Sequence, residues 1–216
     1  MDATEVRRLQ AIERRVRLLA ILEACGDVGI DPVGGHAVHA LAYLTDALAP
    51  VWHLPISEGQ LLKRRHRPFF PALQADLDRL VGMGMVEVPR FAYERDDDGS
   101  GWRLDADYRL MRGLSDPVLS VASTLEGQRT RFSFVREVVR SAAGLGEFGV
   151  SRIGDVDASY TDALVDFNSV LEFGSREGSA SVRAARRFED FVGAEYPISS
   201  AELVHLYMRH LYSRAA

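Results

Sequence analysis

The sequence predicts a mainly helical α+β fold, made of a winged-helix domain and a helical C-terminal extension. Helical periodicity covers most of the chain, and a hairpin pattern interrupts it near the middle. The junction Leu80-Val81-Gly82-Met83-Gly84-Met85-Val86 joins a helix to a strand there. Three helices followed by a hairpin are the winged-helix order, which we place from about Val38 to Leu110. We therefore expect an N-terminal helix plus winged-helix domain at residues 1–112 and a mostly helical extension at residues 113–216.

The first predicted helix runs from Thr4 to Ala24 and ends at Gly26. Apolar residues recur in it at three- and four-residue steps, with charged residues between them. They are Leu9, Ile12, Val16, Leu19 and Leu22. This stripe suits either packing on its own domain, which we favour, or pairing with a partner helix. A second helix is expected from His36 to Leu48, and Pro50 ends it.

Two further helices are expected before the hairpin. Ser57 stands three residues before Gln60, which is a capping-box spacing and predicts a short helix over Glu58–Leu62. A third helix is predicted over Pro68–Val81, with Pro68 and Pro71 in its first turn. Its inward face is expected to carry Leu73, Leu77, Leu80 and Val81.

The predicted hairpin begins with the alternating strand Met85–Val88 and continues through Phe91–Glu94. The polar turn Arg95–Gly101 leads to Trp102–Leu104 and on to Tyr108–Leu110.

Beyond Asp116-Pro117 the sequence pattern is helical again. One helix is indicated by the apolar residues Phe132, Val135, Val138 and Val139. The segment from Tyr160 to Phe173 is expected to be a helix followed by a short strand at Val170–Phe173. Two more helices are indicated by Val182, Ala185, Phe188 and Val192, and by Leu203, Leu206, Tyr207, His210 and Leu211. Ser199 or Ser200 is the expected cap of the last helix, with Glu202 in its first turn.

The composition is that of a folded globular protein. Hydrophobic residues make up 47% of the 216 residues and charged residues 26%. No apolar run is long enough to span a membrane, and the N-terminus lacks an apolar signal segment, so no membrane partner is expected. The single cysteine, Cys25, excludes an internal disulfide and a multi-cysteine zinc site, as is typical of a cytoplasmic protein.

No set of residues predicts catalysis, so we expect a protein that is not an enzyme and has no cofactor or metal. The single lysine has no glycine-rich loop before it, which excludes a P-loop. Gly149–Gly154 is one residue too long for a nucleophile elbow. The remaining candidates lack partners. His36 and His39 have no third ligand, His205 and His210 do not share a helix face, Cys25 has no nearby histidine, and Asp155, Asp157 and Asp162 are typical of solvated loop carboxylates.

The candidate nucleic-acid-binding residues are Lys63, Arg64, Arg65 and Arg67, which form a basic cluster before the third helix. These cations suit either a few sequence-independent phosphate contacts or ion pairs with acidic residues of a partner or of this chain. The net charge of −5 does not attract a polyanion. The third helix presents Asp76 and Asp78 against Arg79, and the hairpin tip Asp96–Asp98 would repel phosphate. We therefore favour a protein-facing use of the fold.

The residues also suggest a family. The string "HAVHALAYLTDALAPVWHLPISEGQLLKRRHRPFFPALQADLDRLVGMGMVEV", with the strands at Trp102 and Tyr108, resembles the middle components of bacterial ABC three-component defence systems, in particular the small subunit of Lamassu-type anti-phage complexes. "SRIGDVDASYTDALVDFNSVLEFG" and "LVHLYMRHLYSR" are similar to that family's C-terminal half.

The resemblance implies a non-catalytic subunit that bridges an SMC- or Rad50-like ATPase and an effector, often a nuclease, in a complex that senses foreign DNA. Its implied partners are therefore these two subunits, with DNA contacted through phosphates. The alternative function is a winged-helix DNA-binding transcription regulator, which would dimerise and hold an operator at physiological salt.

Overall fold

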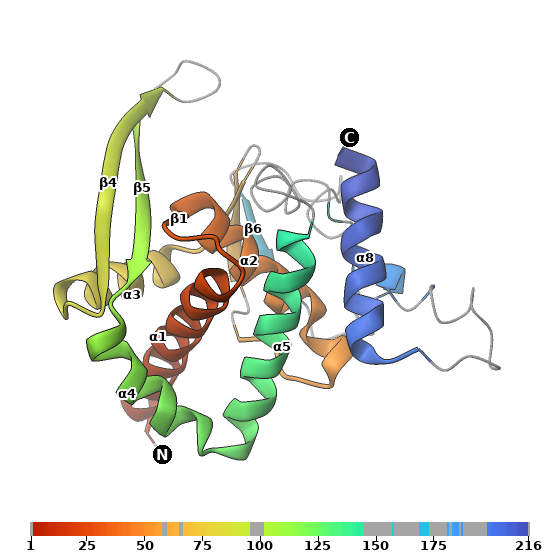
Figure 1. Cartoon of the computed structure of the whole chain (residues 1–216), viewed down its shortest axis with the longest axis horizontal. Coiled ribbons are helices and arrows are strands. Elements are labelled where there is room, and N and C mark those ends of the chain that lie inside the picture. The colour runs from red at the N-terminus through yellow and green to blue at the C-terminus, as the bar shows by residue number, and fades with distance from the viewer. Residues whose placement is uncertain are drawn as a thin grey trace.

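The computed structural model describes residues 2–57, 60–64, 67–95, 102–144, 157, 169–172, 181, 183–185, 187 and 198–215. It is mainly helical with two small antiparallel sheets (Figure 1), which confirms the predicted α+β class. Several predicted features lie outside the described residues: the helix from Tyr160, the Gly149–Gly154 loop, the Asp96–Asp98 tip, and most of the helix marked by Val182 to Val192.

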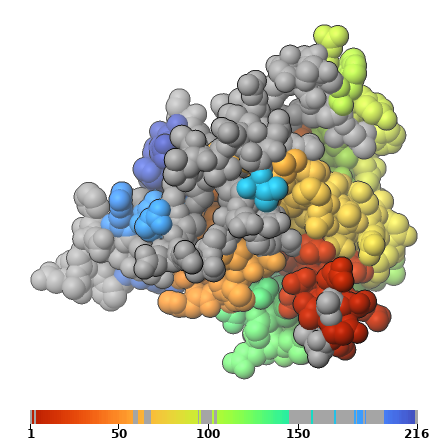
Figure 2. All heavy atoms as spheres, turned by 180° about the vertical axis from the view of Figure 1, so that it is seen from behind, coloured from red at the N-terminus to blue at the C-terminus, as the bar shows by residue number. Residues whose placement is uncertain are grey.

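Helix α1 (Ala3–Asp27) begins at Asp2, whose carboxylate accepts hydrogen bonds from the backbone N–H groups of Thr4 and Glu5. Its second half, from Leu18 to Cys25, is almost entirely buried in the core. Leu9 and Ile12 in the first half remain close to half exposed. The predicted apolar stripe therefore packs on its own domain only over its second half, and the N-terminal turns reach the surface beside α3 (Figure 2).

Helix α2 (Gly35–Leu48) is the central element, because every residue from Ala37 to Leu48 is buried. It follows the short strand β1 (Val33–Gly34) and continues into the 3₁₀ turn η1 (Ala49–Trp52). Its neighbours are α1, α5 and the strands β3 and β5. Such all-round burial is the expected environment of a helix that is apolar on most of its faces.

The predicted helix over Glu58–Leu62 is wrong. Residues Gln60–Arg64 form strand β2, which pairs antiparallel with β3 (Arg67–Phe69) and with β6 (Ser169–Glu172). Two paired strands satisfy the backbone of β2 on both sides, which outweighs a weak local capping signal. Strand β6 confirms the short strand predicted at Val170–Phe173 to within a residue at each end.

Helix α3 (Pro71–Gly82) starts later than predicted. Pro68 belongs to β3 and pairs with Lys63, whereas Pro71 occupies the first turn of the helix. Leu73, Leu77 and Leu80 face the core as predicted. Gly84 then takes a positive φ of 71°, a conformation that favours glycine, and turns the chain into the next strand.

The second sheet has the strand order β1-β5-β4. Strands β4 (Val86–Arg95) and β5 (Trp102–Leu110) form the predicted hairpin, which extends as a long arm away from the helices (Figure 1). The register shifts between Glu87 and Arg90, so Pro89 lies at an irregularity where it costs no ladder hydrogen bond.

The C-terminal half packs on the same core as the N-terminal half. Helices α4 (Arg112–Ser123), α5 (Glu126–Ala143) and α8 (Ser200–Ala215) contribute to one continuous hydrophobic cluster with α1 and α2, across the boundary expected at residues 112 and 113. Ser199 and Glu202 form the predicted cap of α8, each bonding the other's backbone N–H. None of the helices in the described part of the chain is long and apolar enough to cross a membrane.

Candidate functional site

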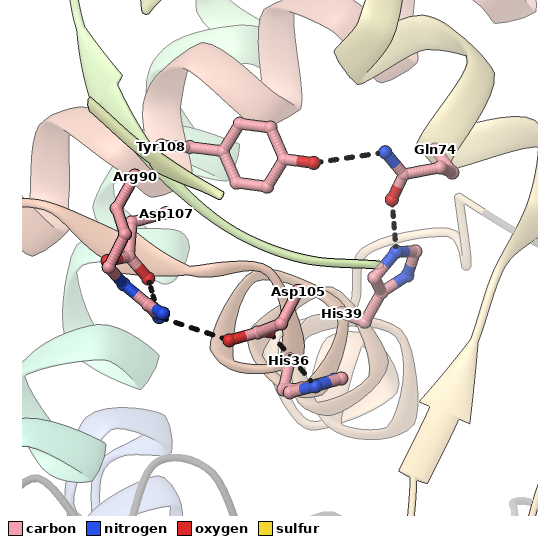
Figure 3. Close-up of polar contacts among 7 residues, drawn as sticks. All are labelled: His36, His39, Gln74, Arg90, Asp105, Asp107 and Tyr108. Atoms are coloured by element: carbon pink, nitrogen blue, oxygen red, sulfur yellow. Dashed lines mark hydrogen bonds and ion pairs between the residues drawn. The ribbon is translucent and has the colours of Figure 1, made fainter. Parts of the chain in front are cut away.

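A cluster of charged side chains lies where the hairpin meets the start of α2 (Figure 3). Arg90 on β4 bonds Asp107 through Nε at 2.6 Å and Nη2 at 3.0 Å, and its Nη2 also lies 3.0 Å from Asp105. Asp105 is buried, and its other oxygen lies 3.2 Å from His36 Nε2. Hydrogen bonds to both carboxylates raise the pKa of Arg90 further above its ordinary value, so this guanidinium stays charged.

A second chain of hydrogen bonds joins α2, α3 and β5. The backbone N–H of Phe70 donates to His39 Nδ1 at 3.3 Å, so Nε2 carries the proton that bonds Gln74 Oε1 at 3.0 Å. The Gln74 amide then donates to the Tyr108 hydroxyl at 3.2 Å and to Asp78 at 2.8 Å. Burial raises the pKa of Tyr108 above its ordinary value, so the hydroxyl stays protonated at neutral pH. Each donor in this chain of hydrogen bonds faces an acceptor, so the network stabilises the packing of α2, α3 and β5.

His36 and His39 do not converge on a common point. His36 Nε2 faces Asp105, whereas both ring nitrogens of buried His39 bond Gln74 and the Phe70 backbone. Within the part of the chain that the structure describes, no group of three His, Cys, Asp or Glu side chains could hold a metal ion. The two histidines therefore fix α2 against the sheet and α3.

Cys25 is a buried core residue, and burial raises the pKa of its thiol to about 12. The thiolate is the reactive form, so the native thiol should be alkylated by iodoacetamide at pH 8 on the order of 10³-fold more slowly than the unfolded chain. Mass spectrometry with and without denaturant measures the two rates. Equal rates would show that Cys25 is accessible and contradict the packing of α1.

Asp157 is the described member of the predicted acidic trio, and it is fully buried instead of solvated. Its carboxylate accepts hydrogen bonds from Tyr43 on α2, from Ser181 Oγ at 2.6 Å and from Tyr207 on α8 at 2.5 Å. The interpretation of Asp157 as a solvated loop residue is thus wrong. Because three hydroxyl donors enclose the carboxylate, it serves as an internal acceptor that joins distant segments.

Ser141, His205 and Glu137 stand in the order of a hydrolytic triad. Ser141 Oγ lies 2.9 Å from His205 Nδ1, and His205 Nε2 lies 2.5 Å from Glu137. Ser141, however, is buried within α5 and donates to the Glu137 carbonyl at 2.7 Å. The N–H groups of the surrounding α5 backbone are used by the helix, so they are not available as oxyanion donors. The arrangement joins α5 to α8 and lacks the features of a nucleophile site.

The basic cluster lies on the β2–β3 hairpin, where Arg64 pairs with Arg67 and Lys63 pairs with Pro68. Arg65 and the side chains of Arg64 and Arg67 lie outside the described residues. Lys63 is only 4% exposed, so its ammonium is not presented to a phosphate in this conformation. Lys63 is the only predicted member of the cluster whose side chain lies among the described residues, and that side chain is buried.

The outward face of α3, predicted to carry Ala72, Gln74, Ala75, Asp76, Asp78 and Arg79, differs from its prediction at Gln74, which is half-buried, and at Asp76. Asp76 is buried. It accepts a hydrogen bond from Arg14 Nε at 2.7 Å and forms an ion pair with Arg15, whose Nε lies 3.2 Å away; both arginines are on α1. The exposed residues of this helix include Ala72, Ala75, Asp78 and Arg79. One carboxylate and one guanidinium among small apolar side chains give no net positive charge for a DNA groove.

The most exposed large apolar side chains near the sheet lie on the hairpin. Phe91 is 67% exposed, Tyr93 71% and Trp102 67%. Because Phe91 pairs with Ala106, Tyr93 with Leu104 and Arg95 with Trp102, all three aromatic side chains share one sheet face. Arg95 lies over the Trp102 ring at 5.6 Å. We call Phe91, Tyr93 and Trp102 the aromatic face.

This aromatic face continues the side of the sheet that enters the core. On β5, Tyr108 and Ala106 are buried, whereas Trp102, further along the same face, is 67% exposed. The sequence argument assigned these residues to strands but missed their exposure. The alternation Phe91-x-Tyr93 beside the hairpin tip indicates that both aromatic side chains lie on one face of a strand. It does not indicate whether other residues bury that face.

No protein-family model matches the chain, and no curated protein or solved structure matches it either.

Proposed function

We propose that this chain is a non-catalytic assembly subunit that docks on a partner protein through the aromatic face of its β4–β5 hairpin. The observation that carries the proposal is the exposure of Phe91, Tyr93 and Trp102 on one side of a projecting arm. Tyrosine and tryptophan are enriched among residues that dominate protein–protein binding energy. An exposed row of three aromatic side chains is also unusual on a surface that stays in water.

The winged-helix assignment is part of this proposal, but not with the predicted bounds of Val38 to Leu110. The helix expected at Glu58–Leu62 is replaced by β2, so α1 has to serve as the first of the three helices. The order helix, strand, helix, helix and two strands, with sheet order β1-β5-β4, agrees with a winged helix in which β4 and β5 form the wing. The β2–β3 hairpin would then be an insertion between the second and third helices. The resemblance of the sequence supplies the partner to test first, an SMC- or Rad50-like ATPase of an anti-phage complex that this subunit would link to an effector.

The lack of net positive charge on the exposed face of α3 supports a docking role over DNA reading. A regulator reads bases with the third helix, and here that helix exposes Asp78 and Arg79 with no excess of cations. The alternative of a transcription regulator is supported by the element order alone.

Replacing Phe91, Tyr93 and Trp102 together with serine is expected to abolish co-purification with the proposed SMC- or Rad50-like ATPase partner. Loss of one interfacial hot spot alone weakens binding by about 30-fold, because it removes about 2 kcal/mol. The measurement is a pull-down from cells that co-express both proteins, followed by titration of the purified pair. Because all three side chains are exposed, the far-UV circular dichroism, which reports helix and strand content, should remain unchanged.

Tyr212→Ser is the matched control, because Tyr212 is a 44% exposed aromatic residue on α8 and lies off the hairpin. It should bind like the unaltered chain. If the triple variant still co-purifies with the ATPase, the docking proposal is wrong. Retention of duplex DNA at physiological salt, lost on charge reversal of Arg64, Arg65 and Arg67, would support the regulator instead.

A further inference from the structure

Strand β4 is an open edge of its sheet. Among the described strands its only neighbour is β5, because the order β1-β5-β4 leaves its other side without a paired strand. Residues Arg90 to Arg95 pair without interruption with Asp107 to Trp102, and β4 lies on the outer side of the projecting arm (Figure 1). Such an edge presents unpaired backbone N–H and C=O groups, to which another strand can add.

The backbone features that usually block strand addition are confined to the base of β4. Natural edge strands are commonly protected by proline, by a bulge or by being short. Pro89 and the register shift between Glu87 and Arg90 lie in the first half of the strand. From Arg90 to Arg95 the strand is regular and largely exposed. This outer half is therefore long and regular enough for a short antiparallel ladder with another strand.

The sequence of this outer half is complementary to itself. In an antiparallel pair of β4 strands centred on Ala92, Phe91 of each copy lies opposite Tyr93 of the other. Arg90 then lies opposite Glu94, so that no like charges face each other along the ladder. Arg90 is already bonded to carboxylates of β5, so this register position counts as an absence of repulsion and not as a new ion pair.

Other registers match the two strands less well. A pair centred on Phe91 sets Tyr93 opposite Pro89, which has no backbone N–H to donate. A pair centred on Tyr93 sets Phe91 opposite Arg95. A shift by one residue puts the aromatic side chains of the two copies on opposite faces of the joined sheet. Of these registers, only the one centred on Ala92 pairs each Phe91 with a Tyr93.

We propose that β4 is a self-association edge, on which β4 of a second copy pairs antiparallel about a two-fold axis at Ala92. Such an isologous pair joins two three-stranded sheets into one continuous sheet. The backbone groups of both edges are then paired, and Phe91 and Tyr93 of the two copies extend the aromatic face across the axis. The pairing uses the edge of the strand and leaves that face open, so it does not depend on the proposed docking function.

The mass of the full chain in solution, measured by light scattering over a range of concentrations, tests the proposal. The unaltered chain is expected to approach twice its mass of 24.0 kDa as concentration rises. Ala92→Lys should raise the dimer dissociation constant by about tenfold or more, because two ammonium groups then meet at the axis. Within one chain the new lysine lies opposite Asp105 on β5, which favours the hairpin. Ala92→Gln is the matched control, because it adds a side chain without a charge and should leave the dimer in place.

Disulfide trapping tests the position of the axis. Only a residue on the axis meets its own copy, at a Cα separation that a disulfide can span, so Ala92→Cys should cross-link two chains under mild oxidation with diamide. Arg95→Cys is the matched control on the same strand, and it should run as a monomer on a non-reducing gel because its two copies lie several residues apart. The native Cys25 does not interfere, because it is buried in the core.

Three results would overturn the proposal. They are a chain that stays monomeric at the highest concentration, equal loss of the dimer from Ala92→Lys and Ala92→Gln, and equal cross-linking of the two cysteine variants. Ala92 lies on the face of β4 opposite to Phe91 and Tyr93, because side chains alternate along a strand. Failure of the self-association proposal therefore leaves the docking proposal to be judged by its own variants.

Discussion

Replacing Arg17 with methionine is expected to lower the free energy of unfolding by about 3–5 kcal/mol, a large part of the typical stability of a domain. Arg17 on α1 is only 8% exposed and reaches into α2. Its Nη2 bonds the Ala42 carbonyl and Thr45 Oγ1, and it lies 3.1 Å from the Asp46 carboxylate. The substitution removes the opposite charge from a carboxylate that is almost fully buried.

The cost comes from the buried carboxylate more than from the lost bonds. Asp46 also accepts from the Ser57 backbone N–H at 2.9 Å, so it cannot leave its site without releasing the loop that follows η1. Arg17 Nη1 has no hydrogen-bond partner among the described residues, although it lies beside a pocket bounded by Thr45, Leu54 and Phe132. The ion pair is therefore under-bonded, and such pairs add little net stability over an apolar pair.

Chemical denaturation of two variants separates these contributions. Arg8→Met, on the exposed side of the same helix, should change the free energy of unfolding by less than about 0.5 kcal/mol. The double variant Arg17→Met, Asp46→Leu should recover most of the loss, because an apolar pair replaces the ion pair. A loss below about 1 kcal/mol for Arg17→Met would mean that Asp46 is stable without the guanidinium.

Elements with strong local periodicity were predictable from the sequence. Helices α1, α2, α5 and α8 and the β4–β5 hairpin lie where the apolar spacing places them. Helix α4 was missed, because Pro117 was taken to mark a break, whereas the structure accommodates it inside the helix. A proline removes one hydrogen bond, and in an exposed position that loss is offset by water.

Features that depend on distant partners could not be predicted. Strand β2 exists because β6 lies beside it, and β6 comes more than 100 residues later in the chain. Asp76 is buried because Arg14 and Arg15 approach it from α1, and no pattern around Asp76 encodes that approach. The exposure of the aromatic face likewise depends on how far the packed helices extend along the β4–β5 hairpin.

The candidate site was therefore predicted only in outline. The role of the basic cluster in binding nucleic acid stays a prediction, and the pairing of β2 with its neighbours leaves Lys63 buried. The protein-facing interpretation of the fold came from charge alone and stays a prediction. The aromatic face adds a specific surface on which it can be tested.

Replacing both Tyr43 and Tyr207 with phenylalanine should lower the free energy of unfolding by about 3–6 kcal/mol. Each hydroxyl donates to the buried Asp157 carboxylate, and a hydrogen bond to a charged group contributes about 1.5–3 kcal/mol. Because Tyr43 lies on α2 and Tyr207 on α8, the double variant should also release α8 before the rest of the fold. Hydrogen exchange of the α8 amides, compared with that in Tyr212→Phe, measures this loss.

The pH dependence of stability supplies an independent check on the same contact. Burial, and then the charge of Asp157, raises the pKa of Tyr43 well above its ordinary value. The unfolded chain therefore loses this proton at a lower pH than the folded chain does. The stability that Tyr43 contributes should be complete below pH of about 10 and should fall as pH rises above it, because the unfolded state then binds fewer protons than the native state. Tyr43→Phe should flatten that alkaline fall, and an unchanged profile would mean that the pKa of Tyr43 is not raised in solution, which would contradict its burial beside Asp157.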